Sequence, residues 1–177
     1  HAMRLAILSL TGCRPAELRK GVLVQTTDCG RFLTVQIRGA KVNAERGQKA
    51  RVIRVPIAGS STKMLASEAQ ISGGRLKIST TDADYRSLNR ALQKAGVSCY
   101  YFRHQVASEL KEAVSTGEMP PQEAAAVMGH RSTESLSYYG TRSKSRGGRP
   151  LRANATNHVK VVPVDYAARA IARATRK

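Results

Sequence analysis

The sequence predicts an α+β fold that is mainly α, with a small antiparallel β-sheet near the N-terminal third. Residues 31–38 and 51–57 alternate apolar and polar side chains with the two-residue period of a strand that buries one face. Beyond residue 80, apolar side chains recur with helical spacing, and glycine or proline separates the segments. With 177 residues, the chain is long enough for about one domain with a buried core.

Two helical segments open the chain. Residues 4–10 form an apolar segment that predicts the end of a helix, and Thr11 with Gly12 breaks it. Pro15 suits the first turn of a second helix, because the N–H that it lacks would be unpaired there anyway. Gly21 ends that helix.

A hairpin with a long tip follows. Strands are predicted at residues 22–25, 31–38 and 51–57, and Pro56 places the end of the last one at a sheet edge. Residues 39–49 form a polar tip between the second and third strands, and this tip carries two lysines.

The rest of the predicted domain, which spans residues 4–177, is a series of helices. Residues 59–79 suggest one helix, and Thr81 with Asp84 forms a capping box for the next. Further helices are expected around Arg103, from Pro121 to Gly129, and from Ser132 or Thr133. Residues 141–157 are predicted to be a basic linker, and residues 158–177 a C-terminal strand and helix.

The composition indicates a polyanionic partner. Lys plus Arg number 30 against 12 Asp plus Glu, which gives a net charge of +18 and a pI near 10.7. Aromatic residues make up only 5% of the chain and Trp is absent, so a base-stacking platform for single strands is not expected. The predicted partner is the phosphate backbone of a nucleic acid, held largely by charge.

The sequence predicts neither a metal site nor a membrane span. The three cysteines, Cys13, Cys29 and Cys99, have no metal-like spacing, and the four histidines show no paired-ligand pattern. No apolar run approaches the roughly 18 residues that indicate a membrane helix. We therefore expect reduced thiols in a cytosolic protein.

Four polar side chains lie where helices are predicted to begin or end. Arg14 and Arg103 are near helix starts, where unpaired backbone N–H groups favour an anion. His130 lies at the turn after a helix. Tyr139 comes nine residues later and shares a helix face with Leu136, so His130 could reach whatever Tyr139 reaches.

Three short stretches contain these residues: TGCRPAEL at 11–18, YYFRH at 100–104, and MGH at 128–130 with Tyr139 downstream. In this order they resemble the two arginine boxes, the Leu-Gly-His motif and the nucleophile box of the tyrosine recombinases, or phage-type integrases. The resemblance covers about residues 5–141, which correspond to the catalytic domain of that family.

The resemblance implies a role for each residue. Tyr139 would attack the scissile phosphate to give a 3′-phosphotyrosyl intermediate, while Arg14 and Arg103 hold the non-bridging oxygens. His130 would hydrogen-bond the phosphate. A lysine on the hairpin would protonate the leaving 5′-oxygen, and Lys41 is the better match, with Lys49 as the alternative.

The sequence departs from the family at two places. Tyr100 stands where the family usually has a histidine, three residues before the second arginine, and a phenol is a poor base near neutral pH. His104 is expected to be structural. The first arginine box begins about ten residues into the chain, so we expect a fragment without the upstream DNA-binding domain that the family normally has.

The resemblance also implies partners. The family acts on duplex DNA as a tetramer without a cofactor, and it integrates or recombines mobile genetic elements. The resemblance therefore also implies a cytoplasmic bacterial protein that works with the nucleoid. Two other activities fit the same residues: a DNA-binding protein without catalysis, and a type IB topoisomerase that relaxes DNA without a specific site. Replacing Tyr139 by Phe would separate the first of these from an enzyme, because binding would survive and covalent attachment would not.

Overall fold

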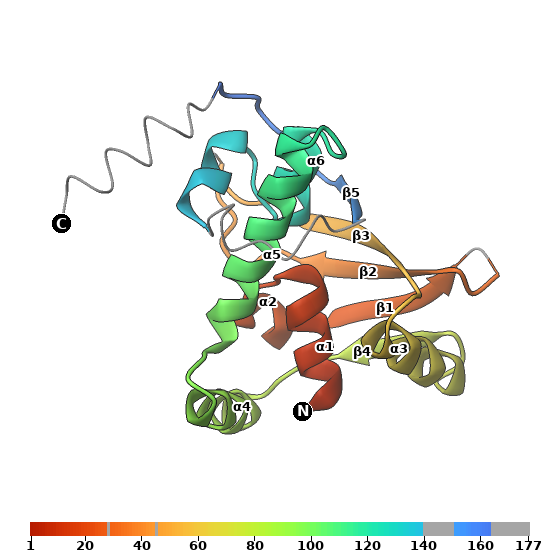
Figure 1. Cartoon of the computed structure of the whole chain (residues 1–177). Helices are drawn as coiled ribbons and strands as arrows, with labels where there is room; N and C mark the ends of the chain where they lie inside the picture. The colour runs from red at the N-terminus through yellow and green to blue at the C-terminus, as the bar shows by residue number, and fades with distance from the viewer. Residues whose placement is uncertain (28, 45, 140–150, 164–177) are drawn as a thin grey trace.

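The computed structural model describes residues 1–27, 29–44, 46–139 and 151–163. Its centre is an antiparallel sheet of five strands in the spatial order β4-β1-β2-β3-β5 (Figure 1). The strands are β1 (Val22–Thr27), β2 (Phe32–Arg38), β3 (Ala50–Pro56), β4 (Arg75–Ile78) and β5 (Arg152–Ala155).

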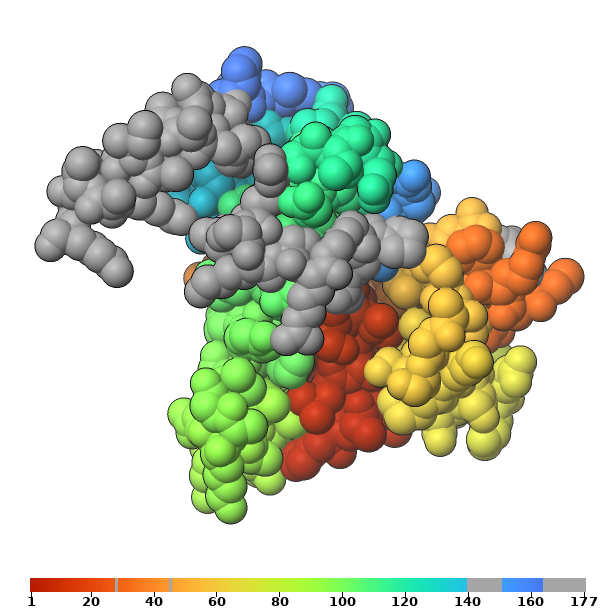
Figure 2. All heavy atoms as spheres, viewed as in Figure 1, coloured from red at the N-terminus to blue at the C-terminus, as the bar shows by residue number. Residues whose placement is uncertain are grey.

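Helices cover one face of this sheet. α6 contacts β3 and β5, α3 contacts β1 and β4, and α1 contacts both α3 and α5. In the space-filling view, α1 lies between α3 and the α4–α5 side of the molecule (Figure 2). The helices are α1 (Ala2–Thr11), α2 (Pro15–Arg19), α3 (Ser60–Ile71), α4 (Asp82–Lys94), α5 (Cys99–Ser115), α6 (Pro121–Val127) and the 3-10 helix η1 (Thr133–Tyr138).

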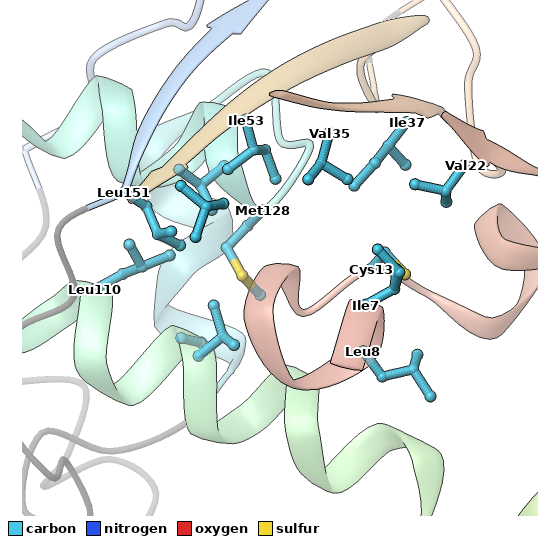
Figure 3. Close-up of a cluster of buried hydrophobic side chains, with 14 of the residues drawn as sticks. Ile7, Leu8, Cys13, Val22, Val35, Ile37, Ile53, Leu110, Met128 and Leu151 are labelled. Carbon is cyan, nitrogen blue, oxygen red and sulfur yellow. The ribbon is translucent and has the colours of Figure 1, made fainter. Parts of the chain in front are cut away.

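The core lies between the sheet and the helices. Along β2, the side chains of Leu33, Val35 and Ile37 are fully buried, whereas Gln36 between them is exposed. This alternation is what a strand with one covered face requires. Figure 3 shows the strand residues Val22, Val35, Ile37 and Ile53 on the side where Ile7, Leu110 and Met128 lie.

The prediction of a mainly helical domain with a small sheet near the N-terminal third is wrong. About 47% of the described residues are helical and about 20% are in strands, so the fold is mixed. The sheet has five strands because β4 and β5 join the predicted hairpin from far along the sequence. Each of these two strands has only four residues, which is too short for a two-residue period to be recognised.

Most other elements lie close to their predicted positions. The capping box at the start of α4 is present, since Thr81 Oγ1 accepts from the Asp84 N–H at 3.1 Å. Pro56 ends β3 beyond the four residues that pair with β5, so its missing N–H leaves no gap in the sheet.

The C-terminal section differs from its prediction. β5 lies inside the stretch assigned to a linker, and residues 158–163 contain a single parallel bridge between Ser132 and Lys160. Residues 141–150 of the predicted linker and the predicted final helix lie outside the described residues.

Candidate functional site

Tyr139 directly follows η1. Ser132 caps this helix by accepting a hydrogen bond from the Glu134 N–H at 3.2 Å, and Leu136 anchors it in the core. The phenol ring stacks on His130 with the ring centroids 5.3 Å apart and the planes inclined by 26°. The Arg103 guanidinium carbon lies 4.6 Å from the centre of the same ring.

Arg103 comes from the second turn of α5 and is almost fully buried, with 1% of its surface exposed. Its Nη1 donates to the Gly12 carbonyl at 2.7 Å, and its Nη2 donates to the Met128 carbonyl at 2.7 Å. Gly12 has a φ of 59°, and a Cβ there would lie 3.0 Å from Val106 Cβ. Glycine at position 12 therefore lets the backbone before Arg14 approach α5 closely.

His130 is placed by the C-terminal end of α6. Gly129 adopts a left-handed conformation with a φ of 70°, its N–H bonds the Ala126 carbonyl at 2.9 Å, and the His130 N–H bonds the Ala125 carbonyl at 2.8 Å. This pair of bonds is the Schellman motif, which explains why glycine precedes the histidine.

Four successive carbonyls at this helix end are satisfied by side chains and backbone from elsewhere in the chain. The acceptors are the carbonyls of residues 127–130. Their donors, in order, are Arg51 Nε at 2.8 Å, Arg103 Nη2 at 2.7 Å, Gln48 N at 3.2 Å and Gln48 Nε2 at 3.0 Å. The orphan carbonyls of a helix terminus are thus covered, two of them by buried cations that suit the negative end of the helix dipole.

The electrostatics of the site fix the protonation of His130. Burial lowers the pKa of His130 well below 6.5, and the charges of Arg103, Arg14 and Arg51 lower it further, so the ring is neutral at pH 7. Arg103 Nη2 lies 3.1 Å from His130 Nε2, and a guanidinium can only donate. Nε2 is therefore the acceptor, and the single ring proton is on Nδ1.

Each of the two side chains that lie against Tyr139 has a buried nitrogen atom with no partner in the described part of the chain. Neither His130 Nδ1 nor Arg103 Nε has a hydrogen-bond partner among the described residues. Buried donors are rarely left unpaired, because each one loses its bond to water. An anionic oxygen that accepts from either nitrogen would satisfy that donor.

Arg14 and Arg51 share one buried carboxylate. Arg14 is the N-cap of α2, and Glu17 accepts from its backbone N–H at 2.8 Å and from its Nη1 at 3.0 Å. Arg51 of β3 donates Nη1 and Nη2 to the same carboxylate at 3.2 and 2.9 Å. Burial alone would raise the pKa of Glu17, but the charges and hydrogen bonds of Arg51 and then Arg14 lower it to about 2. Glu17 is therefore ionised at neutral pH.

The same cations act on Tyr139. Half-burial of the phenol would raise its pKa, but the charges of Arg103 and Arg14, together with hydrogen bonding from both guanidinium groups, give a net lowering from 10. Arg103 itself remains charged at neutral pH, because burial and the charge of Arg14 lower its pKa only to about 10. The arrangement favours a phenolate and holds positive charge next to it.

Four of the six predicted site residues are brought together, namely Arg14, Arg103, His130 and Tyr139. Tyr100 is not part of this cluster. It is exposed in the first turn of α5, close to α4, where it adds to burial and to Cys99 in raising the pKa of Tyr85.

Lys41 and Lys49 are both exposed at the ends of the loop between β2 and β3. The loop is docked against the His130 turn, because Gln48 bonds the carbonyls of Gly129 and His130, and Arg131 bonds the Ala44 carbonyl. The Lys41 amine makes no hydrogen bond or ion pair in the described part of the chain.

Sequence reasoning did not assign two residues of this site, Glu17 and Arg51, and it gave His104 a structural role that stays a prediction. Glu17 was quoted only as part of a motif, although an acidic residue three positions after the N-cap is a capping-box signal. Arg51 occupies the same face of its strand as Ile53 and Val55, and a charged residue in such a register points to a buried partner. His104, expected to be structural, has its ring centroid 5.7 Å from that of Tyr139.

The described residues contain no group of three His, Cys, Asp or Glu side chains placed to hold a metal ion. The cysteines are free thiols, and burial followed by the charge of Glu17 raises the pKa of Cys13 to about 12. In the same part of the chain, the helices are too short or too polar to cross a lipid bilayer.

Comparison with protein-family models, with curated proteins and with solved structures finds no match to this chain.

Proposed function

We propose that this chain breaks and rejoins DNA strands through a 3′-phosphotyrosyl intermediate on Tyr139, as a site-specific recombinase or integrase of the tyrosine recombinase type. One observation carries the proposal. A phenol with a lowered pKa lies against a neutral histidine and a guanidinium, each with one buried nitrogen that has no hydrogen-bond partner among the described residues. A phosphodiester supplies the anionic oxygens that such nitrogens would bind.

The reaction exchanges one ester for another. The Tyr139 Oη–P bond forms and the P–O5′ bond breaks, while the phenol loses its proton and the departing 5′-oxygen gains one. The bond energy is kept in the phosphotyrosine, so the reverse attack by a 5′-hydroxyl rejoins the strand without ATP or a cofactor. Lys41, on the loop docked beside the His130 turn, is the proposed proton donor, with Lys49 as the alternative.

The cluster residues have complementary roles. Arg14 and Arg103 stabilise the negative charge that develops on the non-bridging oxygens, and they lower the pKa of Tyr139. His130 donates its Nδ1 proton to a phosphate oxygen, since Arg103 already occupies Nε2. Tyr100 has no direct part in this scheme, because it lies at the α4 side of α5.

The partner is duplex DNA. The net charge of +18 supports binding to a phosphate backbone, and recombination of two duplexes calls for an assembly of several copies, for which we propose a tetramer. The proposed setting is the bacterial cytoplasm, at the nucleoid, on a mobile genetic element.

A covalent trapping experiment tests the proposal. The probe is a pool of nicked DNA duplexes with randomised central sequence, in which cleavage beside the nick releases a short fragment and traps the protein on the DNA. Wild type should give a DNA-linked band on a denaturing gel, and Tyr139→Phe should abolish it. Tyr138→Phe is the matched control, because Tyr138 is the adjacent phenol and is 61% exposed, so it should trap normally.

Each other outcome has a definite meaning. An adduct that persists in Tyr139→Phe would contradict the assignment of the nucleophile. Duplex binding without any adduct in the wild type would favour the non-catalytic DNA-binding protein. Relaxation of a supercoiled plasmid with no preferred cleavage sequence would favour a type IB topoisomerase.

A further inference from the structure

We propose that Arg51, buried on β3, is a positioning residue that sets both Arg14 and His130 for the reaction at Tyr139. This inference rests on the proposed function, but it concerns a residue outside the motifs that suggested that function. Arg51 is fully buried, and its guanidinium lies between the carboxylate that holds Arg14 and the turn that holds His130.

The first contact fixes Arg14. Each oxygen of Glu17 accepts one bond from Arg14 and one from Arg51, so the carboxylate has a single orientation. Without Arg51, Glu17 would bind Arg14 alone and draw that guanidinium toward itself. Tyr139 would then lose a cation and a hydrogen-bond donor that lower its pKa.

The second contact fixes His130. Arg51 Nε donates to the Val127 carbonyl at 2.8 Å, and a Cβ on Gly129 would lie only 2.7 Å from Arg51 Nη1. The guanidinium therefore packs directly under the Schellman turn. Gln48, three residues earlier in the chain, donates to the carbonyls of Gly129 and His130. Residues 48–51 therefore form one short segment that supports the turn.

The chemistry of the side chain explains why arginine is needed. Three nitrogen atoms in one plane reach a carboxylate on one side and a carbonyl on the other, which a lysine ammonium cannot do with the same geometry. Arg51 also adds positive charge. With His130 neutral, three arginines face one glutamate in the described cluster, an excess of positive charge that suits a bound phosphate.

The test compares Arg51→Met, which keeps the length and removes the charge, with Arg51→Lys, which keeps the charge and removes the planar fork. Arg54→Met is the matched control, because Arg54 lies three residues further along β3, is exposed, and stacks on Phe32 at 3.8 Å. Two quantities are measured on folded protein. The first is the titration of the Tyr139 phenol, obtained by subtracting the titration of the same variant carrying Tyr139→Phe. The second is the single-turnover rate of DNA-adduct formation as a function of pH.

The charged or titratable groups of the cluster around Tyr139 come from four parts of the chain, and Arg103 and Arg14 act on the Tyr139 titration directly. The groups are Arg103 and His104 on α5, Arg14 and Glu17 at α2, His130 after α6, and Arg51 on β3.

We expect Arg51→Met to raise the titration midpoint of Tyr139 and to shift the pH profile of adduct formation upward. The rate at pH 7 should fall on the order of 10- to 100-fold, which is the usual effect of misplacing a catalytic group by about 1 Å. Arg51→Lys should give a Tyr139 titration midpoint between those of wild type and Arg51→Met, and Arg54→Met should match wild type. The salt dependence of duplex binding by the Arg51 variants should equal that of wild type. A residue with a purely structural role would lower the thermal midpoint and leave the phenol titration in place, and that result overturns the proposal.

A second variant covers the case in which Arg51→Met does not fold. Arg51→Met combined with Glu17→Gln leaves no unpaired buried carboxylate. We expect this double variant to fold and still to form adduct at least about tenfold more slowly than wild type, because the guanidinium under the His130 turn is gone and the Val127 carbonyl has lost its donor. A wild-type rate would overturn the proposal. If the wild type forms no adduct, the proposed function fails, but the phenol titration still decides whether Arg51 sets the environment of Tyr139.

Discussion

Two helix starts in this molecule use the same local device in different surroundings. At α2, Glu17 accepts the N-cap N–H of Arg14 at 2.8 Å, and at α4, Asp84 accepts the N-cap N–H of Thr81 at 3.4 Å. Both carboxylates also bind an arginine, since Arg4 pairs with Asp84 at 2.9 Å. The side chain of Glu17 is fully buried, whereas that of Asp84 is 36% exposed.

The difference shows how burial turns a capping residue into part of a site. At α4, water can replace any partner that Asp84 loses, and the hydrogen bonds of Thr81 are the main cause of the lowered pKa of Asp84. At α2, the Glu17 side chain is fully buried, so Glu17 depends on Arg51 and Arg14 and fixes them in return. One carboxylate starts a helix, and the other also orients the cations beside Tyr139.

The largest expected difference is in stability. Glu17→Ala leaves two buried guanidinium groups without their partner and should lower the free energy of unfolding by about 3–5 kcal/mol. Asp84→Ala removes a solvated partner at the surface, so its loss should be several-fold smaller. Urea unfolding of both variants measures the two losses. Equal losses would show that burial does not separate the two helix starts.

The next effect is on catalysis. Arg14→Ala should slow single-turnover adduct formation by about 100-fold or more, equivalent to about 3 kcal/mol of transition-state stabilisation. Arg4→Ala, which removes the pair with Asp84 and the hydrogen bond to the Ser79 carbonyl, should leave the rate unchanged. Adduct formation by both variants on the same nicked duplexes gives the comparison, and a slow Arg4 variant would mean that α4 contributes to the site.

The next prediction concerns the loss of stability in acid that is caused by the buried groups around α2 and the His130 turn. The pKa of Glu17 is lowered from 4.5 to about 2 on folding, so it contributes about 3 kcal/mol above pH 4.5 that is lost as the pH falls toward 2. The pKa of His130 is also lowered on folding, so stability begins to fall as the pH drops below about 6.5, where the unfolded histidine takes up a proton.

Urea unfolding at a series of pH values between neutral and acid measures both losses. His130→Gln should remove the loss that begins near pH 6.5 and keep the loss below pH 4.5. If His130→Gln still loses stability between pH 6.5 and pH 4.5, a group other than His130 causes that loss.

The smallest effect concerns salt. Raising the salt from 0.1 to 1 M shortens the Debye length from about 10 to about 3 Å, which screens exposed pairs far more than buried ones. The destabilisation caused by Arg4→Ala should therefore shrink at high salt, while that caused by Glu17→Ala should persist. Unfolding of the two variants at both salt concentrations tests this, and equal screening would place water at Glu17.

The two regions also show what sequence can predict. Pro15, Gly129 and Ser132 are local signals for helix ends, so Arg14, His130 and Tyr139 could be placed from their neighbours alone. To predict the role of Arg51, one would need to know that β3 packs under the end of α6, a contact between residues 76 positions apart. β4 and β5 were missed for a related reason, since pairing with β1 and β3 defines them more than their own short sequences do.

The most direct test of the account is to identify the residue that carries DNA in the trapped complex. The adduct on the nicked duplexes would be digested with nuclease and protease, and the modified peptide sequenced by mass spectrometry. The account predicts a 3′-phosphonucleotide on Tyr139 and none on Tyr138, Tyr100 or Tyr101. A nucleotide on any other residue, or one attached through its 5′-phosphate, would contradict it.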